Sequence, residues 1–144
     1  MATSLVWLRD DLRIADNPAL TAALAESDHV AILYVLDDES PEVRPLGSAS
    51  RWWLHHSLRS LARDIAELGG HLLLRRGPAR EVVPAVVTEV GATSVHWSRR
   101  FGSARAIDAD LKATLPDAHS HNGTLLHEPW ALQTGGGTPF KVFT

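Results

Sequence analysis

The chain has 144 residues, of which 44% are hydrophobic and 22% charged, and its formal net charge is −3. These values suit one globular domain with a substantial core and are ordinary for a soluble protein. The net negative charge argues against nucleic-acid binding by this chain alone, and the absence of cysteine excludes disulfides, thiolate metal sites and a cysteine nucleophile.

The apolar segments of the chain are short. None approaches the roughly 18 residues that a membrane-spanning helix needs. The N-terminus leads straight into a strand pattern, without the basic start and apolar core of a signal peptide. We therefore expect no membrane partner and a location in the cytoplasm.

The first element is a strand at residues 4–8, an almost wholly apolar run that ends abruptly in charged residues at positions 9–11. A strand that is apolar on both faces is typical of a parallel sheet covered on both sides. Asn17 is a suitable N-cap, and Pro18 a suitable first residue, for the helix that follows. In the loop between them, Arg13 and Asp16 are expected to pair and hold its shape.

The rest of the chain alternates between strand and helix patterns. Further strands are expected at residues 30–36, 71–74, 93–97 and 118–121, and further helices at 51–68, 79–90 and 103–115. Ser48 or Ser50 is expected to cap the second helix, which carries one apolar stripe. The stripe consists of Leu54, Leu58, Leu61, Ile65 and Leu68. Pro84 leaves open whether the third helix begins near that residue or consists of two short pieces.

This alternation predicts an α/β fold, in which a doubly wound, Rossmann-like, five-stranded parallel sheet carries helices on both faces. The expected strand order is 3-2-1-4-5, which places the switch point between the first and fourth strands. Ligands of such sheets bind at the carboxyl edge beside the switch point. We therefore expect the loops at residues 9–11 and 98–100 to face each other across a ligand-binding crevice.

The opening stretch also carries a specific pattern of fixed residues. From Trp7 it reads W-L-R-D-D-L-R-I-A-D-N-P-A-L, which resembles the W-hydrophobic-R-x-D-L-R-x-x-D-N-P-A-L motif of DNA photolyases and cryptochromes. Two later segments resemble the same family, namely R-W-W-L-H-H-S-L from Arg51 and T-L-L-H-E-P from Thr124. The resemblance covers essentially the whole chain.

The resemblance implies that residues 1–130 form the N-terminal antenna-binding domain of a deoxyribodipyrimidine photolyase, a carbon–carbon lyase that repairs cyclobutane pyrimidine dimers in damaged DNA with light. Residues 131–144 would begin the connector to a missing C-terminal helical domain. That domain holds FAD and receives the flipped dimer, whose damage lowers the cost of unstacking. We therefore expect the fragment alone to have no catalytic residue, to bind no FAD and to repair no DNA.

The antenna chromophore of this family is a deazaflavin, a folate or a flavin. Where folate-binding relatives have an aromatic-Glu-Pro sequence, this chain has Phe101, Gly102 and Ser103. The missing glutamate favours a deazaflavin, and folate and flavin remain alternatives. Arginines can stack on a flat ring, and a carboxylate can accept from a ring N–H. The expected chromophore-binding residues are Arg9, Asp37, Arg51, Ser98, Arg99 and Arg100.

Other interpretations stay open at this point. The same domain occurs in cryptochromes, which are light-signalling proteins, and a generic nucleotide-binding α/β domain is a third alternative. The charges at residues 9–11 could form only local salt bridges at a strand end.

Two further groups of residues are assigned to structure rather than chemistry. Most of the five tryptophans are expected in the core, although Trp52 or Trp53 could face the antenna or the missing domain. The pairs His55–His56 and His119/His121 lack an evident further ligand, so no metal site is expected. Finally, Phe140, Val142 and Phe143 are expected to expose an apolar surface through which the fragment self-associates.

Overall fold

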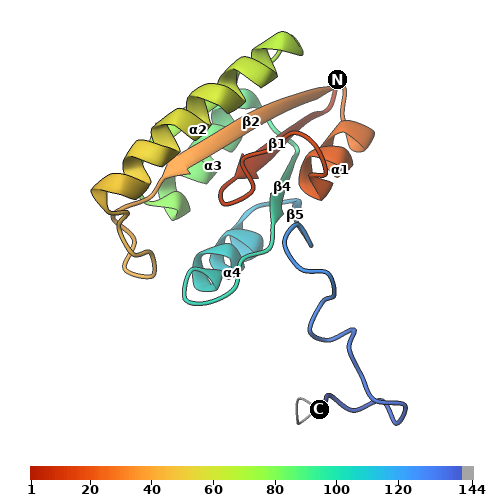
Figure 1. The fold of residues 1–144 in the computed structure, drawn as a ribbon. Helices are drawn as coiled ribbons and strands as arrows, with labels where there is room; N and C mark the ends of the chain where they lie inside the picture. The colour runs from red at the N-terminus through yellow and green to blue at the C-terminus, as the bar shows by residue number, and fades with distance from the viewer. Residues whose placement is uncertain (141–144) are drawn as a thin grey trace.

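The computed structural model describes residues 1–140. In chain order the elements are β1 (Thr3–Leu8), α1 (Pro18–Glu26), β2 (His29–Leu36), α2 (Ser48–Glu67), β3 (Leu72–Arg76), α3 (Ala79–Val90), β4 (Ser94–Ser98), α4 (Arg105–Thr114) and β5 (Ala118–His121). All neighbouring strands are parallel, in the order β3-β2-β1-β4-β5. Helices cover both faces of the sheet (Figure 1), so the predicted fold class is confirmed.

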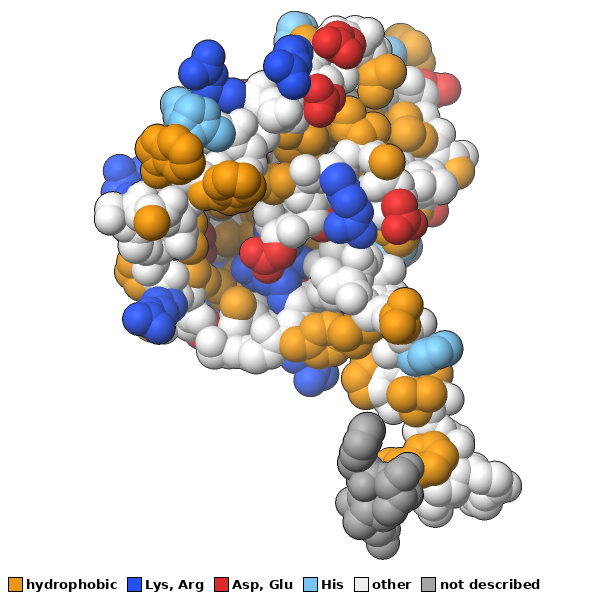
Figure 2. All heavy atoms as spheres, viewed as in Figure 1, with side chains coloured by type: hydrophobic (Ala, Val, Ile, Leu, Met, Phe, Trp, Pro, Cys, Tyr) orange, Lys and Arg blue, Asp and Glu red, His pale blue; other side chains and the backbone are white. Residues whose placement is uncertain are grey.

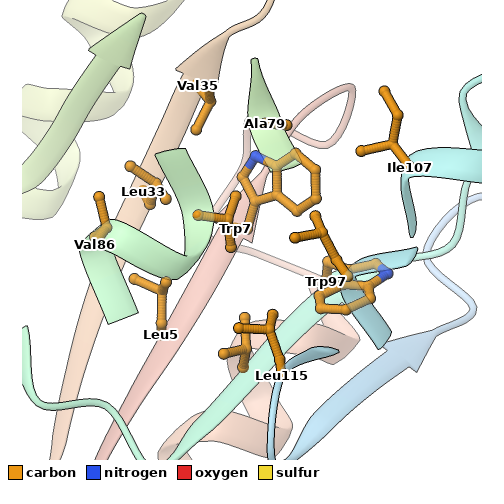
Figure 3. Close-up of a cluster of buried hydrophobic side chains, with 12 residues drawn as sticks. Leu5, Trp7, Leu33, Val35, Ala79, Val86, Trp97, Ile107 and Leu115 are labelled. Atoms are coloured by element: carbon orange, nitrogen blue, oxygen red, sulfur yellow. The ribbon is translucent and has the colours of Figure 1, made fainter. Parts of the chain in front are cut away.

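Two apolar cores lie on opposite faces of the sheet, and β1 supplies both. Leu5 and Trp7 pack in one core with α3 and α4, whereas Val6 and Leu8 pack in the other with α1 and α2. Trp7 meets Trp97 of β4 edge to face, with ring centroids 6.0 Å apart (Figure 3). Successive strand residues point to opposite faces, so an unbroken apolar run is what a central strand of this fold requires.

Helix α2 begins earlier than predicted and is capped differently. Its N-cap is Gly47, which has no side chain, so the expected serine cap is wrong. Within the predicted apolar stripe, Leu61 and Ile65 are buried, but Leu68 is 74% exposed. Leu68 is the C-cap residue, and Gly69 with φ of +82° turns the chain away directly after it.

Helix α3 runs unbroken from Ala79 to Val90 with Pro84 inside it, so neither a start near Pro84 nor two short pieces is correct. The amides of Glu81 and Val82 both donate to the carbonyl of Pro78, at 3.0 Å. This first turn is complete before the proline, which then removes only one backbone hydrogen bond.

Strand β3 extends to Arg76, two residues beyond the prediction. Arg75 and Arg76 pair with Val35 and Leu36 of β2. Because β3 is an edge strand, these two arginines can reach solvent while their backbone continues the ladder.

The expectation that most tryptophans are buried is wrong. Only Trp7 and Trp97 lie in the core, whereas Trp52, Trp53 and Trp130 are 63%, 69% and 59% exposed. Trp52 and Trp53 lie in the first half of α2, which has no buried residue; both buried residues of α2 lie in its second half.

After β5 the chain leaves the α/β body and extends away from it (Figure 1). Between residues 122 and 140 its regular structure is a single antiparallel bridge between Gln133 and Pro139. Phe140 is 66% exposed, while Val142 and Phe143 lie outside the described residues. No helix in residues 1–140 is long and apolar enough to cross a membrane.

Candidate functional site

The loops that follow β1 and β4 meet, as the strand order predicts. Asp11 is almost fully buried and accepts hydrogen bonds from the Ser98 hydroxyl at 2.6 Å and from the Arg9 amide at 3.0 Å. Asn17 also donates to Asp11, and its side-chain oxygen caps α1 by accepting from the amide of Leu20 at 3.0 Å. This network ties both loops to the start of α1.

Arg9 is held by an ion pair rather than left free. Its Nη1 donates to Asp108 of α4 at 2.7 Å, and the Arg100 guanidinium donates to the same carboxylate oxygen at 2.6 Å. Arg9 lies 4.3 Å, and Arg100 5.2 Å, from the centroid of the Trp7 ring. Burial, reinforced by the charge of Arg100, lowers the pKa of Arg9 to about 10 against the opposing effect of Asp108, so Arg9 remains a cation at neutral pH.

These contacts close the predicted crevice. The cavity between the β1 and β4 loops measures only about 10 Å³, although Arg9, Ser98, Arg99 and Arg100 all line it. The structure therefore brings the expected residues together, but their own hydrogen bonds and ion pairs fill the space between them.

Asp37 directly follows β2 and Arg51 lies in the first turn of α2, and both contact the loop that joins these two elements. Asp37 accepts from the amide of Ala79 at 3.0 Å and from the Ser40 hydroxyl at 2.7 Å. Burial opposes the charge of Asp37, but these hydrogen bonds outweigh it and lower the pKa of Asp37. Arg51 pairs with Asp38 at 2.9 Å and donates to the Leu46 carbonyl. Together these contacts hold the segment 37–47 between β2 and α2.

Arg99 contacts β5 and the segment after it, and not the segment 37–47. Its guanidinium pairs with Glu128 and donates to the Ser120 carbonyl, and it lies 5.0 Å from the centroid of the Trp130 ring.

Arg13, in the loop before α1, does not pair with the Asp16 carboxylate as predicted. It donates to the Asp16 carbonyl at 3.1 Å instead, which holds the same loop through the backbone.

A larger cleft lies at the carboxyl edge of β1 and β2, beneath the first half of α2. Its volume is about 420 Å³, and a cavity of about 130 Å³ adjoins it and shares Arg9, Asp10, Tyr34 and Leu46. Figure 2 shows this face of the molecule hollowed. The cleft is lined mainly by Arg9, Asp10, Tyr34, Leu46, Trp53 and Leu54. Its size is that of a small-molecule or cofactor site.

The lining of this cleft is half apolar or aromatic and half polar, and three of its polar residues, Arg9, Asp10 and Arg13, are charged. Trp53 and Tyr34 supply flat faces, and Ser50 and Ser57 supply hydroxyls. Burial raises the pKa of the Tyr34 phenol, and the charge of Asp10 adds to that effect, so Tyr34 stays protonated and can donate. Such a lining suits a planar heteroaromatic ligand with hydrogen-bonding edges.

Sequence reasoning missed most of this lining. Tyr34 lies inside a run interpreted as a buried strand, where it is the only aromatic residue. This single aromatic residue with a hydroxyl, in an otherwise aliphatic run, is the one sequence feature that could have indicated a ligand-facing position. Trp53 was one of two tryptophans expected to face the antenna or the missing domain, and α2 directs it, rather than Trp52, toward the cleft.

A histidine cluster lies on the opposite side of the switch point. His96 of β4 stacks on His119 and His121 of β5, with centroids 5.1 and 5.4 Å away. His96 Nδ1 lies 3.1 Å from His121 Nε2, and His96 Nε2 lies 3.4 Å from Glu26. His96 is therefore the third histidine beside the pair His119/His121, for which the sequence showed no further ligand. Even so, no group of three or more ligands within residues 1–140 is arranged to hold a metal ion.

This cluster predicts a loss of stability at mildly acidic pH. Burial and the neighbouring histidines lower the pKa of His96 against the opposing charges of Glu26 and Asp117. Burial, the neighbouring histidines and Arg99 lower the pKa of His121 against the opposing charge of Glu26. The unfolded chain then binds more protons below about pH 6.5, so the two histidines cost no stability above that pH and destabilise the fold as pH falls below it.

Urea unfolding of the protein and of His121→Gln at pH 7.5, 6.5 and 5.5 measures this effect. The midpoint of the unmodified protein should fall more steeply with pH than that of the variant. His55→Gln, on the exposed face of α2, should behave like the unmodified protein. Identical pH dependence in all three proteins would contradict the prediction.

The fold and the cleft define a class of protein. A doubly wound α/β domain with a ligand-sized cleft at the carboxyl edge of its sheet is typical of nucleotide- and cofactor-binding proteins. The chain belongs to the DNA photolyase family, whose sequence model, described as DNA photolyase, matches residues 4–144.

Individual relatives support this membership. The chain is 40% identical to a deoxyribodipyrimidine photo-lyase of Agrobacterium fabrum, over 99% of this chain and 30% of that protein. It is 34% identical to cryptochrome-2 of Arabidopsis thaliana, over 97% of this chain and 24% of that protein. A crystal structure of a bacterial class III photolyase from Agrobacterium tumefaciens has a TM-score of 0.82 and 39% identity, covering 99% of this chain and 30% of that one. The chain thus spans about a third or less of these relatives and corresponds to their α/β domain.

Proposed function

We propose that this chain is the antenna-binding domain of a DNA photolyase and that the cleft beneath α2 holds the chromophore. The observation that carries the proposal is the cleft of about 420 Å³ lined by Trp53 and Tyr34. When bound, the antenna absorbs light and passes the excitation energy to the flavin of the parent enzyme. This role needs rigid placement of the chromophore and no reactive side chain.

The residues of the cleft fit a planar chromophore. Trp53 offers a face for stacking, and Tyr34 and Ser50 offer hydroxyls to the ring edge. Arg9 contributes to the floor of the cleft, while Asp37 and Arg51 act indirectly by holding the segment that closes one side. Ser98, Arg99 and Arg100 do not line this cleft.

The favoured chromophore is the hydroxylated deazaflavin, because the glutamate of folate-binding relatives is replaced at Phe101–Ser103. An absorption titration of the chain with the deazaflavin, with methenyltetrahydrofolate and with FAD tests this assignment. We expect saturable binding of the deazaflavin at a 1:1 ratio and none of FAD. Tight folate binding would show that the antenna is a folate and not a deazaflavin. Failure of every chromophore to bind would overturn the proposal.

The parent protein would be an enzyme that repairs cyclobutane pyrimidine dimers in damaged DNA. Residues 1–130 would be its antenna domain, and residues 131–144 the start of a connector to a helical FAD domain. The identity of 40% with a photolyase, against 34% with the plant cryptochrome, favours this function over light signalling. Family membership likewise favours it over a generic nucleotide-binding domain.

We further expect the 144-residue chain to self-associate through its C-terminal segment. Leu126, Leu132 and Phe140 are 97%, 49% and 66% exposed there, and exposed apolar surface can mark a site of protein association. Sedimentation velocity over a hundredfold range of concentration should show a rising average mass. Truncation after residue 124 should restore a monomer, whereas a chain that is monomeric throughout would contradict the expectation.

A further inference from the structure

A second cavity lies between the end of β4, helix α4, strand β5 and the segment after β5. Its volume is about 250 Å³, and neither Trp53 nor Tyr34 lines it. The lining residues that matter for its chemistry are Trp97, Arg99, Phe101, Arg105, Lys112 and Trp130. This cavity is therefore separate from the cleft beneath α2, which is called the antenna cleft from here on.

The charge around this cavity is positive and incompletely neutralised. Asp108, the one acidic residue in its lining, already pairs with Arg9 and Arg100. Among residues 1–140, Arg105 and Lys112 form no ion pair, and the Lys112 ammonium donates to the Ser120 hydroxyl at 3.4 Å. Both residues are exposed on α4, seven residues and thus two turns apart. Two cations without a carboxylate partner on one face favour an anionic group at the mouth of the cavity.

The remaining lining offers flat apolar surface. Trp130 and Phe101 are 59% and 45% exposed, and the Arg99 guanidinium lies over the Trp130 ring. The indole Nε1 of Trp97 is buried without a hydrogen-bond partner, a donor that faces no acceptor of the protein. Exposed aromatic faces beside free cations are the combination that binds a base and its phosphate.

We propose that this cavity binds a nucleoside phosphate, with its base on Trp130 and Phe101 and its phosphates at Arg105 and Lys112. The site is separate from the antenna cleft and does not depend on the identity of the antenna. The ligand class is set by two requirements together: a planar ring for the aromatic faces and a multiply charged anion for the unpaired cations.

Calorimetric titration of the 144-residue chain with ADP tests the proposal, with adenosine and pyrophosphate as partial ligands. We expect 1:1 binding of ADP with a Kd below about 1 mM, and weaker binding of both partial ligands. The charge reversal Arg105→Glu/Lys112→Glu should weaken ADP binding at least tenfold. Trp130→Ala should weaken ADP binding and leave pyrophosphate binding unchanged.

Matched controls separate this site from the rest of the surface. Arg63→Glu reverses an exposed charge on α2, and Trp52→Ala removes a tryptophan of similar exposure; neither should change ADP binding. Trp53→Ala should not change it either, which distinguishes this site from the antenna cleft. Absence of ADP binding, equal binding of pyrophosphate, or loss of ADP binding in Trp53→Ala would overturn the proposal.

Discussion

Replacing Trp53 with alanine is expected to weaken chromophore binding about tenfold or more. The face of Trp53 lines the cleft at its α2 side, and stacking of a heteroaromatic ring on an aromatic side chain contributes roughly 1–3 kcal/mol. A loss of 1.4 kcal/mol corresponds to a tenfold change in Kd. Absorption titration of the variant with the deazaflavin measures the effect directly.

Trp52→Ala provides the matched control for this experiment. Trp52 is the adjacent residue of the same helix and is 63% exposed, against 69% for Trp53, but its ring contacts His56 and not the cleft. Its removal should leave the Kd unchanged. If both variants weaken binding equally, the chromophore does not occupy the cleft beneath α2.

Asp108→Ala is expected to lower the free energy of unfolding by about 3–5 kcal/mol, because it leaves two arginines without their carboxylate. Asp108 is 8% exposed, and the side chains of Arg9 and Arg100 that it pairs with are 7% and 17% exposed. Removing one partner of a buried ion pair costs far more than removing a surface charge, since the remaining charge stays out of water. Urea unfolding followed by tryptophan fluorescence gives the value.

The control for this variant lies two residues further along α4. Asp110 pairs with Arg80 at 2.8 Å, but its side chain is 59% exposed. Asp110→Ala should therefore change stability by less than about 1 kcal/mol. A loss below about 1 kcal/mol for Asp108→Ala would show that water reaches the two arginines and that the ion pairs do not hold the β1 and β4 loops.

The sequence alone determined which elements form and how they follow one another along the chain. Residues 4–8 form an apolar run that only a central strand can bury on both faces, and Asn17 with Pro18 marks a helix start that the structure confirms. Parallel strands joined by helices have few allowed topologies, so the alternation left a small number of strand orders, among them the observed 3-2-1-4-5. These features depend on the local spacing of apolar residues and on the general rules for connecting parallel strands, and both can be applied to the sequence alone.

Only the tertiary structure decided which polar side chains remain free for a ligand. Arg9 comes from a strand end, as a ligand-binding residue should, but its partner Asp108 lies 99 residues away. Conversely, Tyr34 and Trp53 line the cleft because β2 and α2 lie side by side at the sheet edge, 19 positions apart in the chain. Strand ends predict where charges gather, whereas the pairing of those charges depends on side-chain direction and on distant neighbours. For this reason the edge of the sheet where these charges gather was predictable, and the position of the cleft within that edge was not.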